Sequence, residues 1–257
     1  MSEVMLEGKK LHKSFSDKNG QILAVNNVSF SLEEGEFLGI VGESGSGKST
    51  LLRMMAGLEE VDGGNLYYQH TDYTGDAAKN TGRFLQMIFQ DAYASFDPRM
   101  KMRDSVMEGV KRKNLKDTSE EKEVEKRLLD LMSGLGLDDS LLEKRPKELS
   151  GGQCQRMSIL RALLSGAKIL LCDEITSALD VVTQNQICKL LQRIGRESNV
   201  SIIFVSHDIA LVSKFCTKML VMHEGQVVEE GSTSDVIASP KHPYTRQLIS
   251  CSRGLSL

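Results

Sequence analysis

The stretch "GESGSGKST", Gly42–Thr50, has the pattern G-x-x-x-x-G-K-[ST] and joins two segments of different character. Before it, Phe37–Val41 is a short apolar run, typical of a strand that is buried on both faces. After it, residues 48–56 favour a helix that Gly57 can end. A glycine-rich loop between a buried strand and a helix N-terminus presents backbone N–H groups to phosphate oxygens. The stretch therefore predicts an α/β core with a phosphate-binding loop.

The side chains of this loop indicate a nucleotide that carries a magnesium ion. Lys48 is expected to reach the β- and γ-phosphates, and the Ser49 hydroxyl to ligate Mg²⁺. The alternative is a glycine turn with a chance lysine, which the strand–loop–helix context argues against. The predicted nucleotide-binding residues of this segment are Gly42, Glu43, Ser44, Gly45, Ser46, Gly47, Lys48, Ser49 and Thr50.

Two carboxylates follow a second apolar strand in "KILLCDE", residues 168–174. In a doubly wound sheet, the carboxyl ends of the parallel strands lie at the edge that also carries the phosphate loop. Asp173 is therefore expected to hold Mg²⁺, usually through water, and Glu174 to polarise the attacking water as general base. Two exposed loop carboxylates are the alternative, which the presence of the phosphate loop disfavours.

Two further polar residues end predicted strands at the same edge. His207 ends "FVSHD" and is expected to hydrogen-bond the γ-phosphate and orient the water. Gln90 follows the predicted strand 84–89 and is expected to touch Mg²⁺ or that water. A lone histidine is more often structural or exposed, and a lone glutamine is a weak signal, so both assignments depend on the shared edge. The predicted catalytic residues are thus Lys48, Gln90, Glu174 and His207, and the predicted metal ligands are Ser49, Gln90 and Asp173.

The remaining sequence surrounds this core with other layers. Val28, Phe30 and Leu32 alternate with polar residues, as in a half-buried strand, and residues 60–82 are rich in turn-forming residues. The predicted fold class is α/β, with a core of mainly parallel sheet, an N-terminal antiparallel β layer and a helical insertion subdomain. A single domain is expected over residues 1–257, with residues 1–90 and 156–257 as the α/β core and residues 91–155 as the helical subdomain.

Composition excludes several classes of protein. The 257 residues are 40% hydrophobic and 26% charged, with a net charge of −3, which argues against a general affinity for nucleic acid. No apolar run approaches the roughly 20 residues that span a bilayer. The N-terminal "MSEVMLEGKKLHKSF" lacks the apolar core of a signal peptide, so a cytoplasmic chain is expected. The five scattered cysteines form no C-x-x-C and are expected to be reduced structural thiols.

Taken together, the motifs resemble the ATP-binding cassette (ABC) family over nearly the whole chain. The phosphate loop, Gln90, "LSGGQ" at residues 149–153, "LLCDE", "SALD" and His207 occur in that family's order. The resemblance implies the ABC ATPase fold, built on a P-loop NTPase core, and hydrolysis of ATP with Mg²⁺. It also implies that Asp180 of "SALD" lies at the seam between two cassettes.

Two positions depart from the family's usual residues. Phe15 stands at the aromatic position that stacks on adenine, where tyrosine is commoner; phenylalanine keeps the π-face and loses only a hydroxyl. Ile175 stands where the family usually has proline after the catalytic glutamate, which is expected to alter local stiffness and not chemistry.

The "LSGGQ" segment looks like a second anion site, because glycines precede a helix-compatible run. In the ABC family two cassettes pack head to tail, and this loop caps the γ-phosphate of the ATP that the other chain holds. The resemblance therefore implies that Ser150, Gly151, Gly152 and Gln153 bind the nucleotide of a partner cassette.

Two segments resemble the ATPases of peptide and nickel importers. "FQDAYASFDPRM", residues 89–100, is similar to their FQDPxxSLNPRM stretch, with alanine, phenylalanine and aspartate replacing proline, leucine and asparagine. "SPKHPYTRQL", residues 239–248, is similar to their C-terminal HPYT signature. The resemblance implies an ATPase that energises uptake of a peptide, nickel or metal-chelate substrate from the inner face of the cell membrane. Its expected partners are a second, non-identical ABC ATPase, a two-subunit membrane permease and, indirectly, a solute-binding protein.

Three other functions are disfavoured. A soluble ABC ATPase of DNA repair or translation usually shows a long coiled-coil insertion, a zinc module or a second cassette, and this sequence shows none of them. The HPYT tail argues against an exporter ATPase. Intact Lys48, Glu174 and His207 argue against a non-hydrolysing regulatory cassette.

The segment after Gln90 is the expected docking surface for the permease. Met100, Met102, Val106 and Met107 would offer adaptable apolar contacts to a short helix. The alternative is that these side chains pack inside the helical subdomain.

Overall fold

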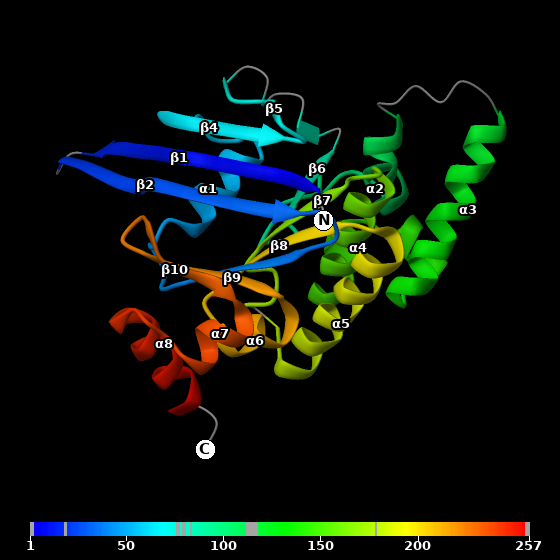
Figure 1. Cartoon of the computed structure of the whole chain (residues 1–257). Helices are drawn as coiled ribbons and strands as arrows, with labels where there is room; N and C mark the ends of the chain where they lie inside the picture. Colours follow the sequence, from blue (N-terminus) through cyan, green and yellow to red (C-terminus); the bar gives the residue numbers. More distant parts are fainter. Residues whose placement is uncertain are drawn as a thin grey trace.

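The computed structural model describes residues 3–17, 20–75, 78, 81–82, 84–111, 118–177 and 179–254, arranged around two sheets (Figure 1). The larger sheet has the strand order β10-β9-β3-β8-β7-β6 and is parallel except for β10. Its strands are β3 (Phe37–Val41), β6 (Leu85–Ile88), β7 (Ile169–Asp173), β8 (Ser201–Ser206), β9 (Lys218–His223) and β10 (Gln226–Ser232). The mainly parallel sheet confirms the predicted α/β class.

The smaller sheet is antiparallel and has the order β2-β1-β4-β5. Its strands are β1 (Val4–Asp17), β2 (Gly20–Glu33), β4 (Gly63–Tyr68) and β5 (Thr71–Asp72). The predicted alternation in β2 is confirmed, because Val28, Phe30 and Leu32 are buried while Ser29 is exposed. This sheet is the N-terminal antiparallel layer that the sequence predicted.

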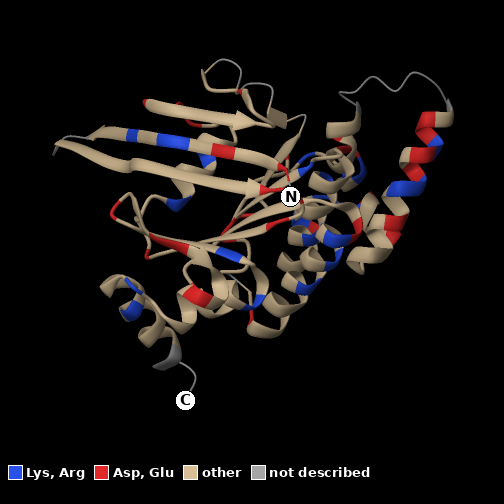
Figure 2. Ribbon diagram, viewed as in Figure 1, with Lys and Arg blue, Asp and Glu red and all other residues tan. Residues whose placement is uncertain are grey.

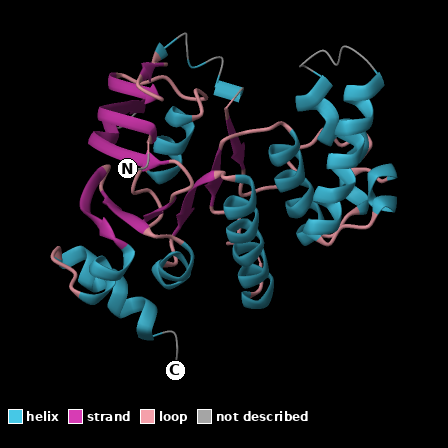
Figure 3. Cartoon of the chain, turned by 45° about the vertical axis from the view of Figure 1, so that its right-hand side comes forward, coloured by secondary structure: helices cyan, strands magenta, loops and turns pink. Residues whose placement is uncertain are grey.

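The helices lie between and around the sheets. They are α1 (Lys48–Met55), α2 (Met102–Lys111), α3 (Thr118–Leu135), α4 (Gly151–Leu164), α5 (Val181–Ser198), α6 (Ile209–Phe215), α7 (Thr233–Ala238) and α8 (Pro243–Gly254), with 3-10 turns at Asp139–Glu143 and Pro146–Glu148. In Figures 1 and 3, α2 and α3 stand at one end of the molecule, away from both sheets. Acidic and basic residues alternate along α3 (Figure 2), and Arg103 of α2 donates to both carboxylate oxygens of Glu125 at 2.9 Å.

Two hydrophobic cores lie on opposite faces of the larger sheet. In β3, Leu38 and Ile40 belong to the core that contains α1 and the antiparallel sheet, whereas Phe37 and Val41 belong to the core that contains α4, α5 and α6. Successive side chains of a strand point to opposite faces, so a strand covered on both sides is apolar throughout. This double burial explains the unbroken apolar run before the phosphate loop.

Helix α4 connects the sheet to the helical end of the molecule. It packs against α2 and α3 on one side and against β6 on the other. The predicted limit of the helical subdomain, between residues 155 and 156, therefore falls inside α4. One continuous helix therefore links the two predicted parts of the chain.

The predicted docking surface on α2 is wrong at two of its four positions. Met102 and Val106 are both fully buried, at 0% exposure, in the core shared with α4. Met107 is partly buried against the same core, and Met100 is half-buried. An amphipathic helix turns its apolar stripe towards the protein, and here that stripe contains Met102 and Val106. The alternative that these side chains pack internally therefore holds for them.

The five cysteines are free thiols, as the sequence predicted. Cys154, Cys172, Cys188 and Cys216 are buried, and Cys251 is exposed. Burial raises the pKa of Cys154 to about 11 and that of Cys188 to about 12, so both remain protonated near neutral pH.

Within the described part of the chain, each helix is too short or too polar to cross a bilayer.

Candidate functional site

The phosphate loop leaves β3 at Gly42 and enters α1 at Gly47, and both positions require glycine. Their φ angles are 155° and 98°, in the region that side chains disfavour. A Cβ on Gly47 would lie 2.1 Å from the carbonyl oxygen of Ala24, and one on Gly42 would lie 2.2 Å from that of Met222. The loop is thus pressed between β2 and β9, which fixes the direction of its N–H groups.

Lys48, the first residue of α1, folds back over the loop. Its ammonium donates to the carbonyl oxygens of Gly42 at 2.9 Å and Glu43 at 2.6 Å. Only 3% of the side chain is exposed, and burial lowers the pKa of the ammonium, with nearby carboxylates, Glu174 foremost, opposing that shift. A phosphate at this loop would offer the ammonium charged acceptors, which make stronger hydrogen bonds than carbonyls.

Ser49 and Asp173 meet at the carboxyl end of β7. The Ser49 hydroxyl donates to Oδ1 of Asp173 at 2.8 Å, although the two residues are 124 positions apart. Asp173 is buried, and burial raises the pKa of its carboxyl while the Ser49 hydrogen bond lowers it. A hydroxyl and a carboxylate oxygen side by side are ligands that suit Mg²⁺, so the pair fits the predicted metal ion.

Glu174 lies between the loop lysine and His207. Its Oε1 is 3.9 Å from Nζ of Lys48, and its Oε2 is 3.7 Å from Nδ1 of His207. The backbone of Glu174 has a φ of 47°, a left-handed conformation that costs a residue with a side chain on the order of 1 kcal/mol. A hydrogen bond from its N–H to the Val205 carbonyl at 3.2 Å holds this turn. The turn aims the carboxylate at the phosphate loop.

Gln90 is tied to the same turn through Ser177. Its amide donates to the Ser177 hydroxyl at 2.9 Å, and that hydroxyl donates to the Glu174 carbonyl at 2.9 Å. Gln90 and Glu174 also line one cleft with Lys48. The structure therefore brings all four predicted catalytic residues to one edge of the larger sheet.

The far wall of this cleft comes from residues that sequence reasoning missed. It is lined by Ile22, Leu23, Ala24, Glu224 and Gly225. Gly225, in the β9–β10 turn, donates to the Ser46 carbonyl at 3.1 Å and so supports the phosphate loop from outside. The signal in the sequence was the apolar run of residues 22–25 directly after a polar turn, and the structure leaves Ile22 and Leu23 of that run exposed.

Phe15 stands beside this wall. It pairs with Ile22 in the β1–β2 ladder, is 39% exposed and has the Lys13 ammonium 5.3 Å from its ring centroid. As far as the described residues define the cleft, Phe15 does not line it directly. An exposed ring next to a lining residue leaves a face free for stacking.

The "LSGGQ" segment lies apart from the phosphate loop of its own chain. Ser150 caps α4: its hydroxyl accepts from the Gln153 N–H at 3.3 Å, and the Gln153 side chain accepts from the Ser150 N–H at 2.9 Å. None of the described residues 149–153 lines the cleft that contains Lys48. Ser150 and Gly151 are exposed, so this helix N-terminus faces outward.

Asp180 caps the next long helix, α5, by accepting from the N–H groups of Val182 and Thr183 at 3.0 Å. Val181 and Val182 beside it are 70% and 66% exposed. Ala178 of "SALD" lies outside the described residues. Ile175, in place of the family's proline, is buried next to Glu174.

Comparisons with known sequences give one family. The model of the ABC transporter family matches residues 25–177. The oligopeptide transport ATP-binding protein OppF of Haemophilus influenzae is 40% identical over 260 residues, which cover 96% of this chain and 78% of that protein. OppF of Escherichia coli is also 40% identical, with 96% and 77% covered. The glutathione import ATP-binding protein GsiA of Pectobacterium atrosepticum is 42% identical over 90% of this chain and 37% of its own length.

Solved structures give the same fold. The protein cbiO1 of Clostridium perfringens, part of the ABC transporter complex cbiONQ, superposes with a TM-score of 0.79 at 25% identity, over 99% of this chain and 100% of that one. The ATP-binding cassette MJ0796, in a dimeric post-hydrolysis state with ADP and phosphate, also gives 0.79, at 29% identity over 89% and 99%.

Proposed function

This chain belongs to the ABC transporter family, and we propose on that premise that it is the ATP-hydrolysing subunit of a peptide importer. The observation that carries the proposal is the position of Glu174, whose carboxylate lies within 4 Å of both Lys48 and His207. The names of the relatives support peptides as the transported class, since OppF is an oligopeptide transport ATP-binding protein and GsiA a glutathione import one. Of the substrates that the sequence left open, peptides are therefore favoured over nickel and metal chelates.

The site residues divide the chemistry of hydrolysis among them. Lys48 and the loop N–H groups hold the β- and γ-phosphates, and Glu174 accepts the proton of the attacking water. His207 orients the γ-phosphate and that water. Gln90 contacts the water or the metal ion and is hydrogen-bonded to Ser177 in the turn after Glu174. Ser49, Gln90 and Asp173 are the residues that would hold Mg²⁺, which neutralises charge on the phosphates when it is bound.

The decisive experiment removes the loop cation. Lys48→Ala is expected to lower the ATPase rate by about 100-fold or more, because electrostatic stabilisation of the phosphates is the main source of rate in such a site. Lys9→Ala is the control, since Lys9 is an exposed lysine paired with Glu7 on β1. A Lys48→Ala chain that folds normally and keeps most of its turnover would show that this loop is not the catalytic phosphate site.

The substrate class needs a separate test. The chain, co-purified with its membrane permease and solute-binding protein in vesicles, is expected to take up labelled oligopeptides when ATP is supplied. Uptake of Ni²⁺ without uptake of peptides would overturn the peptide assignment and leave the ATPase assignment standing.

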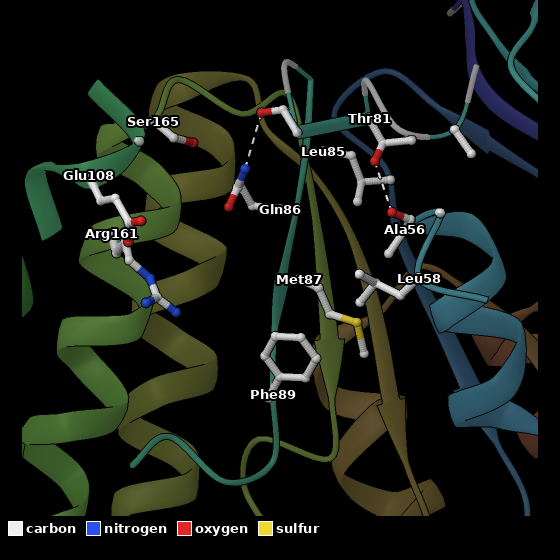
Figure 4. Close-up of a pocket in the computed structure, with 14 residues that line it drawn as sticks. Ala56, Leu58, Thr81, Leu85, Gln86, Met87, Phe89, Glu108, Arg161 and Ser165 are labelled. Atoms are coloured by element: carbon white, nitrogen blue, oxygen red, sulfur yellow. Dashed lines mark hydrogen bonds between the residues drawn. The ribbon is translucent and has the colours of Figure 1, made fainter. Parts of the chain in front are cut away.

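The permease is expected to dock in a groove between α1 and α4, shown in Figure 4. Ala56 and Leu58 form one wall, Met87 and Phe89 the floor, and Arg161 of α4 lies on the other wall. Leu58 is 58% exposed, an unusual position for leucine at the end of a buried helix. The groove lies between the larger sheet and the helical end of the molecule. A permease helix bound in it would therefore be displaced when these two parts move relative to each other.

The second partner is another cassette, which we infer to be a non-identical one from the Pro-Arg-Met ending of residues 98–100. In this arrangement Ser150, Gly151, Gly152 and Gln153 close over the ATP of the partner. The outward-facing N-terminus of α4 supports that arrangement.

The chain acts as one ABC ATPase domain of residues 1–257 at the inner face of the cell membrane. Residues 1–90 and 156–257 serve as the nucleotide-binding core and residues 91–155 as the helical subdomain, with α4 common to both. Residues 1–2 and 255–257 lie outside the described part of this domain.

A further inference from the structure

Tyr244, the tyrosine of the "HPYT" segment, contacts the phosphate loop directly. Its hydroxyl accepts a hydrogen bond from the backbone N–H of Glu43 at 2.9 Å, although 201 positions separate the two residues. The tyrosine is only 7% exposed, and its ring stacks on His223, with 3.9 Å between centroids and 23° between planes. The ring is thus held by the stack on His223, and its hydroxyl is aimed at the second residue of the loop.

The hydrogen bond leads to Lys48 through a single residue. The carbonyl oxygen of Glu43 accepts from the Lys48 ammonium at 2.6 Å and from the Ser46 N–H at 3.2 Å. When the N–H and the carbonyl of one residue are both bonded, its two peptide planes have little freedom to rotate. Tyr244 therefore helps determine where the oxygen that holds Lys48 stands.

Helix α8, which carries Tyr244, is itself held at its start and along its length. The Glu229 carboxylate of β10 accepts from the N–H groups of Lys241 at 2.8 Å and His242 at 3.0 Å. The helix packs on α6, which begins two residues after His207, and Figure 1 shows α8 beside α6 and α7. One pocket is lined by Gln247, Leu248 and Cys251 of α8 together with Glu43, Ser44, Glu174 and His207.

We propose that Tyr244 is a positioning residue of the ATPase site, and that α8 is a brace that fixes Glu43, and through it Lys48, for ATP binding. The proposal rests on the phosphate loop being the ATP site of the proposed function. It gives the C-terminal segment a role in nucleotide affinity, besides its packing against α6.

The test is Tyr244→Phe, which keeps the ring stack on His223 and removes only the acceptor of the Glu43 N–H. ATP affinity of the purified full chain is expected to fall about three- to tenfold, the effect of losing one hydrogen bond of ordinary net strength. Hydrogen exchange of the amides in residues 42–47 is expected to become faster. The matched control is Tyr73→Phe, because the Tyr73 hydroxyl is also buried and donates to a backbone oxygen, that of Met55 at 3.2 Å. This control is expected to bind ATP as tightly as the wild type.

A Tyr244→Phe chain with wild-type ATP affinity and a lowered melting temperature would overturn the proposal, because Tyr244 would then serve only to hold α8. Glu229→Ala is the second variant if Tyr244→Phe does not fold, since it keeps the tyrosine side chain but frees the start of α8, the helix that positions it. Unchanged ATP affinity and unchanged amide exchange in that variant also overturn the proposal. Lys48→Ala distinguishes failure of this inference from failure of the proposed function. If Lys48→Ala binds ATP as tightly as the wild type, the proposed ATP site is wrong, whatever the result for Tyr244→Phe.

Discussion

At Asp173, burial raises the pKa of the carboxyl, so the ionised form is less favourable in the folded chain than in the unfolded one. The sign follows from linkage: a carboxyl whose pKa is raised on folding binds its proton more tightly in the folded state, so its ionisation destabilises the fold as pH rises through that pKa. A bound Mg²⁺ would remove this destabilisation, which explains why an unfavourable charge is placed beside Ser49.

Asp173→Asn is therefore expected to stabilise the metal-free chain by on the order of 1 kcal/mol while abolishing ATPase activity. The amide keeps an oxygen for the Ser49 hydroxyl and loses the charge that attracts the metal ion. Thermal unfolding without nucleotide or Mg²⁺ and a steady-state ATPase assay check the two halves. A variant that is less stable than the wild type would mean that the Ser49 hydrogen bond and the attraction to Arg53 and Lys48 outweigh the burial of Asp173.

Phe15 makes its contribution through an exposed ring face. Phe15→Ala is expected to weaken ATP binding by about 1–3 kcal/mol, the range for stacking of a base on an aromatic side chain, and Phe15→Tyr to be nearly neutral. Equilibrium titration with ATP measures both. Phe15 lies beside the cleft wall and does not line it, so unchanged affinity in Phe15→Ala would rule out the assignment of Phe15 to adenine stacking.

At the scale of helices and strands, the sequence predicted those features that depend on a short local pattern of residues. The strand β3, the glycine turns and α1 follow from apolar runs and from backbone conformations that only glycine accepts, so their places were predictable. The edge that gathers Lys48, Glu174 and His207 follows from parallel strand order. Contacts between distant elements have no such local cause. The Tyr244–Glu43 hydrogen bond and the wall formed by the β9–β10 turn depend on how α8 and that hairpin pack, which no short pattern encodes.

The methionines of α2 show a second kind of information that a sequence pattern does not contain. Periodicity marks Met102 and Val106 as one apolar face, but it does not say whether that face meets a core or a partner. The structure assigns them to the core, whereas Leu58, in the turn after α1, is a large apolar side chain that is exposed at the groove of Figure 4. Sequence reasoning passed over Leu58 because it follows the helix-ending Gly57 and belongs to no periodic stripe.

The difference between Leu58 and Met102 is measurable. Leu58→Asp is expected to leave the ATPase activity of the isolated chain and its melting temperature nearly unchanged, and to weaken co-purification with the permease. Met102→Asp is expected to destabilise the chain by about 3 kcal/mol or more, because it places an unpaired charge in a filled core. Normal assembly of a well-folded Leu58→Asp chain with the permease would show that the groove is not the docking site.

For the whole molecule, the two anion sites of the chain face different ways. Lys48 sits in a cleft closed by β2 and the β9–β10 turn, whereas the Ser150 end of α4 is exposed and lines no part of that cleft among the described residues. In the proposed arrangement, one chain supplies half of each of two sites, and complete sites would form when two cassettes pair head to tail. We expect this pairing to depend on ATP, since the γ-phosphate is an anion that the N-terminus of a second helix would attract.

Glu174→Gln removes the base and keeps the shape of the side chain, so bound ATP is expected to persist and to hold two cassettes together. On size exclusion, the wild-type chain should elute mainly as a monomer, and Glu174→Gln with ATP should shift towards a dimer. Adding Ser150→Arg should abolish the shift, because its bulk and charge occupy the place of the partner's phosphate, while ATP affinity of the monomer stays the same. Ser150→Ala is the control for loss of the α4 cap, which alone costs about 1 kcal/mol of stability. If Ser150→Arg instead removes ATP binding from the monomer, and Ser150→Ala does not, the serine serves the nucleotide of its own chain and the two-chain site is wrong.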